Sequence, residues 1–319
     1  MALTWDRVRH IFRNLIWLKY HIRLFGYPAW VKQPTVIHLD THNYCNAKCS
    51  YCNPQHLWCK ERGFLPLDVI EAVLKYFHHK KLLLSQCRPF INGEPMLEHR
   101  LPEILGMVKK YTSAETVIYS NAITYENREL LLDKNLNRVK FTVSAATRET
   151  YRVVHGVDKF ADAIKTVLWF KRNKRRDQKL HLNYVYSGLN AHELPLWREL
   201  FTGIHQIVLP LHEAESQTQS AQVKGDIPFA SALNVSGGSL QYSDFRPCAC
   251  WHVLSISWRG EIMQCCDIPY KYNWGHVDDE DILDVWNQRN ELGLDHEGCS
   301  GCNLKNPMWN NIFEKYVWS

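Results

Sequence analysis

Three cysteines with short spacings are the residues of this sequence best suited to chemistry. Cys45, Cys49 and Cys52 are separated by three and then two residues. Thiolates are soft ligands that favour iron–sulfur clusters, zinc or Cu(I). A 4Fe–4S cluster normally takes four thiolates, so three clustered ligands would leave one iron free to bind another molecule. For zinc, His42 or Asp40 could supply a fourth ligand.

The composition is that of an ordinary globular chain. Its 319 residues suit one large domain or two moderate ones, and the apolar content of 45% argues against wholesale disorder. Lys and Arg exceed Asp and Glu by 38 − 33 = 5, which is no nucleic-acid signature. The eleven cysteines fall mostly in groups and no secretory signal begins the sequence, a pattern typical of metal ligands. No apolar run approaches the roughly 20 residues of a transmembrane helix, so we expect a reducing, cytoplasmic location.

Apolar strands alternating with helices are predicted from residue 35 to residue 212. The expected strands are 35–40, 82–91, 115–119, 138–143, 179–186 and 206–211, and the expected helices are 67–79, 102–111, 127–133, 160–174 and 192–201. This alternation predicts an α/β fold of parallel βα units that curl into a partial, TIM-like (β/α)6 barrel. Catalytic groups in such barrels lie at the carboxyl ends of the strands. The residues that fall there are Cys45, Cys49, Cys52, Asn92, Gly93, Glu94, Ser120, Asn121 and Ser144.

The cysteine segment resembles the cluster loop of the radical S-adenosylmethionine (SAM) superfamily. That loop is Cys-x3-Cys-x-aromatic-Cys after the first strand, and Tyr51 fills the aromatic position. Gly93–Glu94–Pro95, at the end of the second strand, resembles the Gly-Glu-Pro motif of the same superfamily. The resemblance implies that the three thiols bind a 4Fe–4S cluster whose free iron is chelated by SAM.

The resemblance also implies which residues contact SAM. Glu94, with backbone groups near Asn92, would accept hydrogen bonds from the ammonium, and Gly93 would let the backbone approach closely. Ser120, Asn121 and Ser144 would contact the ribose, Tyr51 the adenine. An electron from a donor such as flavodoxin or ferredoxin would split SAM into methionine and a 5′-deoxyadenosyl radical. That radical would remove a hydrogen atom from the substrate.

A second cysteine-rich region follows residue 247. It contains Cys250-x9-Gly260-x4-Cys265, then Ile282–Trp286 and a Cys-x2-Cys pair, and it resembles the SPASM/twitch extension of radical SAM enzymes. The resemblance implies one auxiliary 4Fe–4S cluster and a hairpin around Arg259–Gly260. Its implied ligands are Cys265, Cys299, Cys302 and either Cys248, which we prefer, or Cys250. A structural four-cysteine zinc site is the alternative for this spacing.

Four regions are therefore expected. Residues 1–34 are an N-terminal region in which residues 5–25 are expected to form a basic amphipathic helix. That helix packs across the barrel end or, alternatively, lies on a membrane surface. Residues 35–212 form the partial barrel, 213–247 a linker or substrate-covering loop, and 248–319 the auxiliary-cluster extension. Tyr184 and Tyr186 share one face of the fifth strand, where they could touch substrate or fill the core.

The leading functional hypothesis is a radical SAM oxidoreductase or epimerase. Its substrate would be a small sugar-like or aminocyclitol-like molecule, which would be dehydrogenated or epimerised. The alternatives are a SPASM-type maturase acting on a ribosomally made peptide and a non-catalytic zinc-binding protein. About 34 residues precede the first strand, too few for a small independent leader-binding domain, which favours the small molecule.

Overall fold

A computed structural model describes residues 33–52, 60–210, 252–266, 270, 272–278 and 281–288. Several predictions of the sequence fall outside these ranges and remain predictions. They concern the N-terminal amphipathic helix, the segment 213–247, and Cys248, Cys250, Cys299 and Cys302. No helix within the described ranges is long and apolar enough to cross a membrane.

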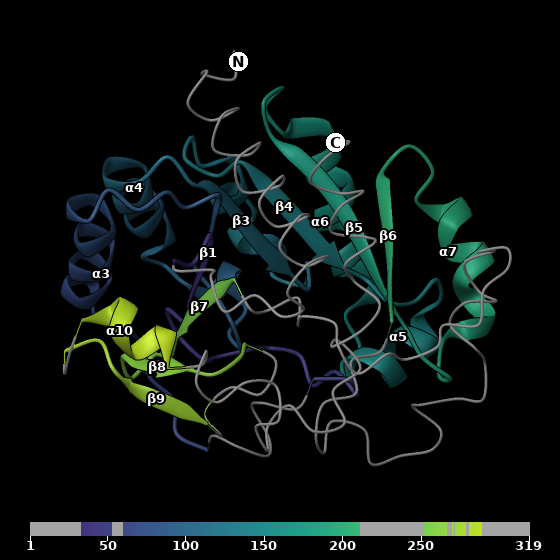
Figure 1. Ribbon diagram of the computed structural model, residues 1–319. Coiled ribbons are helices and arrows are strands. Elements are labelled where there is room, and N and C mark those ends of the chain that lie inside the picture. Colours follow the sequence, from purple (N-terminus) through teal and green to yellow (C-terminus); the bar gives the residue numbers. More distant parts are fainter. Residues whose placement is uncertain are drawn as a thin grey trace, which may run out of the picture.

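The described strands form one nine-stranded sheet in the order β6-β5-β4-β3-β2-β1-β7-β8-β9 (Figure 1). The strands from β1 to β6 are all parallel to their neighbours. Their bounds are β1 Val36–Leu39, β2 Gln86–Arg88, β3 Glu115–Ser120, β4 Arg138–Thr142, β5 Lys179–Tyr186 and β6 His205–Pro210. The predicted α/β fold with six parallel strands is confirmed. Among the described strands the sheet stays open, because β6 and β9 are its edges.

The C-terminal strands extend this same sheet. Strand β7 (Val253–Ile256) pairs in parallel with β1, and β8 (Glu261–Met263) and β9 (Asn273–His276) follow in antiparallel order. The predicted hairpin between β7 and β8 is present, and Gly260 in its turn has a φ of 84°. The sequence did not predict that β7 lies beside β1. The C-terminal region is thereby joined to the first strand, whose end leads into the cysteine loop.

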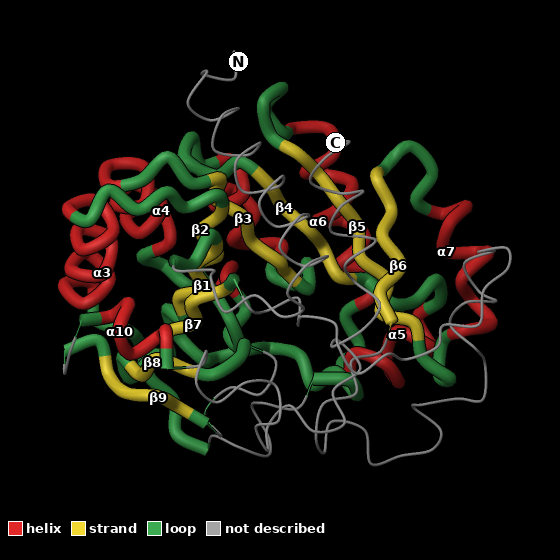
Figure 2. Tube along the Cα trace, in the orientation of Figure 1, coloured by secondary structure: helices red, strands yellow, loops and turns green. Residues whose placement is uncertain are grey.

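Amphipathic helices cover one face of the sheet. In α3 (Leu67–His79), the side chains at Ile70, Val73, Leu74 and Phe77 follow the helical period and are all buried. The other α-helices are α4 (Leu101–Tyr111), α5 (Arg148–His155), α6 (Phe160–Asn173), α7 (Leu194–Leu200) and α10 (Ile282–Asn287). Figure 2 shows α10 near β8 and α3, and Lys80 after α3 forms an ion pair of 2.7 Å with Asp281 before α10.

Two predicted helices differ in the structure. The helix predicted at 127–133 is instead a 3₁₀ helix, η2 (Tyr125–Leu132), of which only Leu131 is buried, so no apolar stripe supports an α-helix there. The helix predicted at 192–201 is a 3₁₀ turn, η3 (Ala191–Glu193), followed by α7. A third short 3₁₀ helix, η1 (Pro95–Leu97), follows β2.

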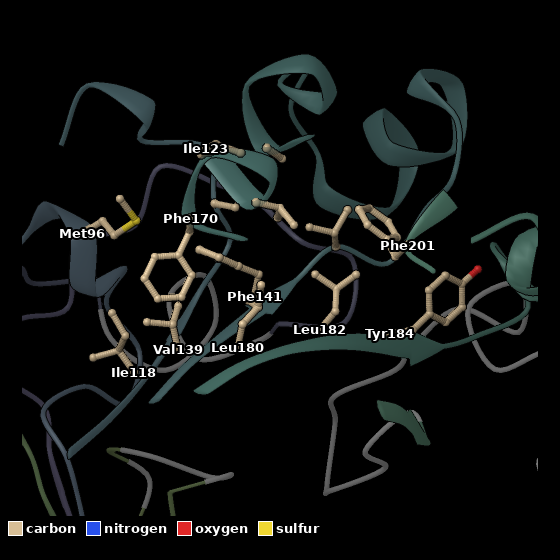
Figure 3. Close-up of a cluster of buried hydrophobic side chains, with 14 of the residues drawn as sticks. Met96, Ile118, Ile123, Val139, Phe141, Phe170, Leu180, Leu182, Tyr184 and Phe201 are labelled. Atoms are coloured by element: carbon tan, nitrogen blue, oxygen red, sulfur yellow. The ribbon is translucent and has the colours of Figure 1, made fainter. Parts of the chain in front are cut away.

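The larger apolar core lies between the sheet and α6. Phe141 of β4 and Leu182 of β5 point into it, and Phe170 of α6 meets Phe141 edge-on at a centroid distance of 5.8 Å (Figure 3). Tyr184 belongs to this core: its ring lies 4.9 Å from that of Trp197, and its hydroxyl donates to the carbonyl of Asn190 at 2.5 Å. Of the two roles left open for Tyr184, the structure therefore supports the packing role.

Truncating the core ring of α6 tests this packing. Phe170→Ala is expected to lower the free energy of unfolding by about 3–5 kcal/mol, because it leaves a cavity beneath the sheet. Leu168→Ala in the same helix removes a side chain that is 37% exposed and should cost about 1 kcal/mol or less. Urea unfolding followed by circular dichroism measures both. Equal losses would contradict the assigned face of α6.

Candidate functional site

The loop that carries Cys45, Cys49 and Cys52 leaves the carboxyl end of β1 and is held by the last turn of α5. The backbone N–H of Lys48 donates to the carbonyl of His155 at 3.0 Å, and that of Ser50 donates to the carbonyl of Val154 at 2.8 Å. The last carbonyls of a helix have no partner inside the helix, so they are available as acceptors for another segment. The cysteine loop therefore provides hydrogen-bond donors for two carbonyls at the C-terminal end of α5.

Capping residues define both ends of α5 (Arg148–His155). Thr147 is its N-cap and accepts a hydrogen bond from the N–H of Thr150 at 3.3 Å. Gly156 is its C-cap in the left-handed region, at a φ of 67°. A Cβ at Gly156 would lie 2.3 Å from the carbonyl oxygen of Lys48, so glycine is also required for the close approach of the loop.

His155 joins α5 to both the cysteine loop and β4. Its Nε2 accepts a hydrogen bond from the backbone N–H of Ser144 at 3.0 Å. Its Nδ1 lies 3.3 Å from Sγ of Cys49. Burial lowers the pKa of His155 to about 3, so the ring is neutral and carries one proton. Because a backbone N–H can only donate, that proton is on Nδ1, which donates to Sγ of Cys49.

The thiols need a positive charge nearby to ionise. Desolvation, followed by the charges of Cys52 and Cys45, raises the pKa of Cys49 well above its ordinary value. Desolvation raises the pKa of Cys52 to about 11. Metal ligation requires the thiolate, and a bound metal supplies the charge that stabilises it.

The donors on this loop are suited to a soft metal centre. Cys45, Cys49 and Cys52 supply three thiols from one loop, and thiolates favour iron–sulfur clusters, zinc or Cu(I). Across the described part of the chain, no three His, Cys, Asp or Glu side chains converge closely enough to hold a single metal ion. The two side chains considered as a fourth zinc ligand make other contacts. Asp40 accepts from the N–H of Asn92 at 3.0 Å and from the hydroxyl of Tyr270, and Nδ1 of His42 accepts from the N–H of Tyr44 at 3.0 Å.

Glu94 ties the ends of two strands together. It is 3% exposed, and its carboxylate accepts from the N–H of Met96 at 3.1 Å and from the N–H of Asn121 at 2.8 Å. Burial raises its pKa to about 7. Each carboxylate oxygen has a second lone pair, so Glu94 can still accept from a ligand. Pro95 starts η1, for which Glu94 is the N-cap.

Gly93 is placed where no side chain fits. A Cβ there would lie 2.3 Å from the carbonyl oxygen of His42 and 2.8 Å from its ring. The sequence predicted that Gly93 allows a close backbone approach, and in the structure the approaching backbone is the loop after β1. The ends of β1 and β2 therefore depend on this glycine for their packing.

The predicted ribose-contacting residues differ in their surroundings. Ser144 Oγ accepts from the N–H of Val185 at 3.0 Å and lies 3.5 Å from the hydroxyl of Tyr51. Asn121 Nδ2 donates to Oδ1 of Asn46 at 2.8 Å and faces Sγ of Cys45 at 3.8 Å. Ser120 is 3% exposed, and its Oγ accepts from the N–H of Ala122 at 3.0 Å. All three therefore bind the protein's own backbone or the cysteine loop.

Three residues that support this site were not predicted from the sequence. His155 positions Cys49, Asn190 donates to the carbonyl of Ser144 at 2.8 Å, and Glu193 accepts from the N–H of Ala146 at 2.6 Å. A signal for α5 was available, because Thr147 and Gly156 are a typical N-cap and C-cap pair. Cys265 is described and half-buried, whereas the other cysteines predicted to join it lie outside the described residues.

The profile of the radical SAM superfamily matches residues 39–200, half of the chain. The chain belongs to the radical SAM superfamily. It is 25% identical over 195 residues to the probable GTP 3′,8-cyclase of Pyrococcus horikoshii, a match that covers 60% of this chain and 58% of that protein. The chain thus matches only somewhat more than half the length of this curated relative.

Two solved structures share the fold. Streptococcus suis SuiB bound to S-adenosylmethionine superposes with a TM-score of 0.64 and 16% identity, covering 99% of this chain and 81% of SuiB. The protein anSMEcpe with bound AdoMet superposes with a TM-score of 0.61 and 15% identity, covering 85% of this chain and 87% of that one. At these identities the likeness concerns the fold.

A substitution at the contact between α5 and the cysteine loop tests the geometry of the site. Gly156→Ala is expected to push the loop away from α5, because its Cβ would meet the backbone of Lys48. The amide protons of Lys48 and Ser50 should then exchange with solvent at least about tenfold faster, the effect of losing roughly 1.4 kcal/mol of local stability.

Gly203→Ala is the matched control. Gly203 has a φ of 79°, so alanine there meets the same backbone strain, but its nearest neighbour is the flexible end of Lys171 at 3.4 Å. Exchange at Lys48 and Ser50 should be unchanged in this variant. Equal exchange in both variants would show that α5 does not hold the loop.

Proposed function

We propose that this chain is a radical SAM enzyme that cleaves SAM reductively and begins its reaction by abstracting a hydrogen atom from the substrate. The observation that carries the proposal is the set of three thiols on one loop, at the carboxyl edge of a parallel sheet. N–H donors of His155 and Asn121 face two of these thiols, Cys49 and Cys45. Membership of the radical SAM superfamily supports the same assignment.

Each residue of the site has a proposed part. Cys45, Cys49 and Cys52 hold a 4Fe–4S cluster, which when bound supplies the electron that splits SAM into methionine and a 5′-deoxyadenosyl radical. Glu94 accepts a charge-assisted hydrogen bond from the SAM ammonium. Tyr51 lies beside the adenine. The hydroxyl of Ser144 faces the ribose of the nucleoside. A flavodoxin-like or ferredoxin-like donor provides the electron from outside the chain.

A second cluster is the part of the proposal that concerns the C-terminal region. Cys265 lies after β8, the strand that pairs antiparallel with β7. We propose that Cys248, Cys265, Cys299 and Cys302 ligate an auxiliary 4Fe–4S cluster. Near the substrate, such a cluster would take up the second electron of a dehydrogenation.

The proposed substrate is a small sugar-like or aminocyclitol-like molecule that is dehydrogenated or epimerised. A nucleotide is the second candidate, favoured by the GTP 3′,8-cyclase relatives, whose name gives GTP as their substrate. Product analysis of anaerobic reactions with each class separates the two. A hydrogen atom transferred from substrate into 5′-deoxyadenosine identifies the correct class.

Removal of one thiol tests the proposed cluster. Cys49→Ala is expected to abolish formation of 5′-deoxyadenosine from SAM under strong reduction and to lower the iron content from about eight to about four per chain. Cys87→Ala is the control, because Cys87 is buried in the core beneath α3 and α4, away from the loop. It should retain cleavage and iron. Two zinc ions in place of iron, or full cleavage by Cys49→Ala, would contradict the proposal.

The hydrogen bond from His155 should tune the proposed cluster. An N–H donor to a ligand sulfur stabilises the additional negative charge of the reduced state, so it raises the reduction potential. His155→Phe is expected to lower the potential by about 40–60 mV, since one hydrogen bond is worth roughly 1–1.5 kcal/mol and a tenfold change in a one-electron equilibrium is about 59 mV.

His155→Asn is the matched variant, because its amide can still donate toward Cys49 from the position of Nδ1. Its potential should lie close to that of the wild type. Redox titration followed by electron paramagnetic resonance measures both variants. An unchanged reduction potential in His155→Phe would show that the hydrogen bond from His155 does not tune the cluster.

A further inference from the structure

The inner face of the sheet, defined here as the face opposite the α6 core, carries two polar side chains in direct register. Phe141 of β4 and Leu182 of β5 point into the α6 core (Figure 3). Because successive side chains of a strand point to opposite faces, Thr142 and Asn183 point to the inner face. These two residues are partners in the pairing of β4 with β5, and neighbouring strands lie about 4.8 Å apart. No other strand separates them, so they form one adjacent pair.

Asn183 of this pair carries a buried acceptor without a donor. The residue is 2% exposed, and its Oδ1 accepts no hydrogen bond from the described part of the chain, including the hydroxyl of Thr142. Leaving a buried acceptor unpaired costs free energy, and the large majority of such atoms in native proteins have a donor. This Oδ1 is therefore a candidate acceptor for a bound molecule.

Asn190 shows, by contrast, an asparagine whose amide serves the fold. It is fully buried, and its Oδ1 accepts from the N–H of Ser187 at 2.8 Å. Its Nδ2 donates to the carbonyls of Ser144 and Val185, both at 2.8 Å. Oxygen and nitrogen of this amide both have protein partners, so burial alone does not explain the unpaired oxygen of Asn183.

The surroundings of Asn183 are less closed than the residue itself. His181 and Val185 are its neighbours on the same face of β5, and both are partly exposed. Thr142, its partner on β4, is also partly exposed. The hydroxyl of a threonine can donate one hydrogen bond and accept others. The pair therefore offers a ligand an acceptor from Asn183 and a donor or acceptor from Thr142.

The pair lies one pleat from the residue proposed to contact the ribose of SAM. Ser144 Oγ accepts from the N–H of Val185 at 3.0 Å, so these two residues lie level with each other on β4 and β5. Thr142 precedes Ser144 by two residues, and Asn183 precedes Val185 by two, about 7 Å along each strand. A molecule bound to the pair would lie next to the nucleoside, where a substrate must lie to give up a hydrogen atom.

Lys140 favours a neutral hydroxyl over an ammonium as the ligand's donor. It is the next inner-face residue before Thr142 on β4 and is 6% exposed. Its ammonium donates to the neutral hydroxyl of Tyr119 at 3.0 Å. Like charges repel, and the repulsion is stronger where little water screens it. A ligand ammonium beside Thr142 would meet this repulsion, whereas a hydroxyl would not.

We propose that Thr142 and Asn183 bind a hydroxylated part of the substrate. One neutral hydroxyl donates to Oδ1 of Asn183, and a second forms a hydrogen bond with the hydroxyl of Thr142. This chemistry fits a neutral sugar-like molecule better than an aminated one. That the bound molecule is the substrate rests on the proposed function. That the pair binds hydroxyl groups does not.

Asn183→Leu separates a role in binding from a role in the fold. Leucine has nearly the shape of asparagine and removes the unpaired amide, so the urea midpoint of this variant should equal or exceed that of the wild type. Asn190→Leu is the matched control and should lower the midpoint, because it leaves the partners of its amide unpaired. A midpoint that falls as far in Asn183→Leu as in Asn190→Leu would assign Asn183 to the fold and overturn the proposal.

Binding of small polyols to the anaerobically purified full chain tests the ligand chemistry. Isothermal titration uses D-glucose and myo-inositol, which are neutral, and D-glucosamine, which carries an ammonium. The wild type is expected to bind a neutral polyol more tightly than glucosamine. Asn183→Leu and Thr142→Val should each bind that polyol about fivefold more weakly, the loss of one hydrogen bond. Thr142→Ser keeps the hydroxyl and should bind within about twofold of the wild type.

Several results would overturn the proposal. They are a wild type that binds neither neutral polyol, a wild type that prefers glucosamine, and equal polyol binding by the wild type, Asn183→Leu and Thr142→Val. The affinity for SAM is measured on the same variants. If it falls in Asn183→Leu while polyol binding is unchanged, the pair contacts the ribose of SAM and the proposal is wrong. A wild type that binds a polyol as expected but does not cleave SAM would contradict the proposed function and leave the hydroxyl site.

Discussion

The hydrogen bonds between the cysteine loop and the last turn of α5 are the constraint on which the site depends. A loop with three cysteines has no regular structure of its own, so its thiols face one region only if another element fixes its backbone. The carbonyls of Val154 and His155 provide that fixation by accepting the N–H groups of Ser50 and Lys48. Gly156 allows the contact, and His155 adds a donor to Cys49 from the same turn. One helix end thus sets both the position and the surroundings of the proposed cluster ligands.

The polar residues at the ends of the strands form hydrogen bonds with other groups of the protein itself. Glu94 joins the end of β2 to the end of β3, and Asp40 joins the end of β1 to Asn92. Ser144 is bound on three sides, by His155, Val185 and Asn190. Such groups are already oriented when a ligand arrives, so less conformational entropy is lost on binding. The same bonds explain how these buried polar side chains are tolerated.

Sequence reasoning predicted the parts of the structure that have a strong local pattern. The apolar alternation of Lys179–Tyr186 and the helical period of Leu67–His79 gave both elements their exact bounds. The three cysteines and Gly93–Glu94 were placed correctly at the edge of the sheet, since parallel strands end on the same side. The pairing of β7 with β1 could not be predicted, because it joins residues more than two hundred positions apart and no local rule specifies the partner. The role of His155 was not predicted, because it depends on two tertiary contacts. Its ring must meet the N–H of Ser144 on one side and the thiol of Cys49 on the other, and no local sequence pattern shows either contact.

In the proposed function, three thiols hold a cluster in which one iron is left open for SAM. Electron paramagnetic resonance of the anaerobically reduced protein, recorded with and without SAM, examines that open iron. SAM is expected to change the signal of the cluster that depends on Cys49, because the ligand of one iron changes. A reduced spectrum that stays the same at saturating SAM would show that no iron is open to SAM.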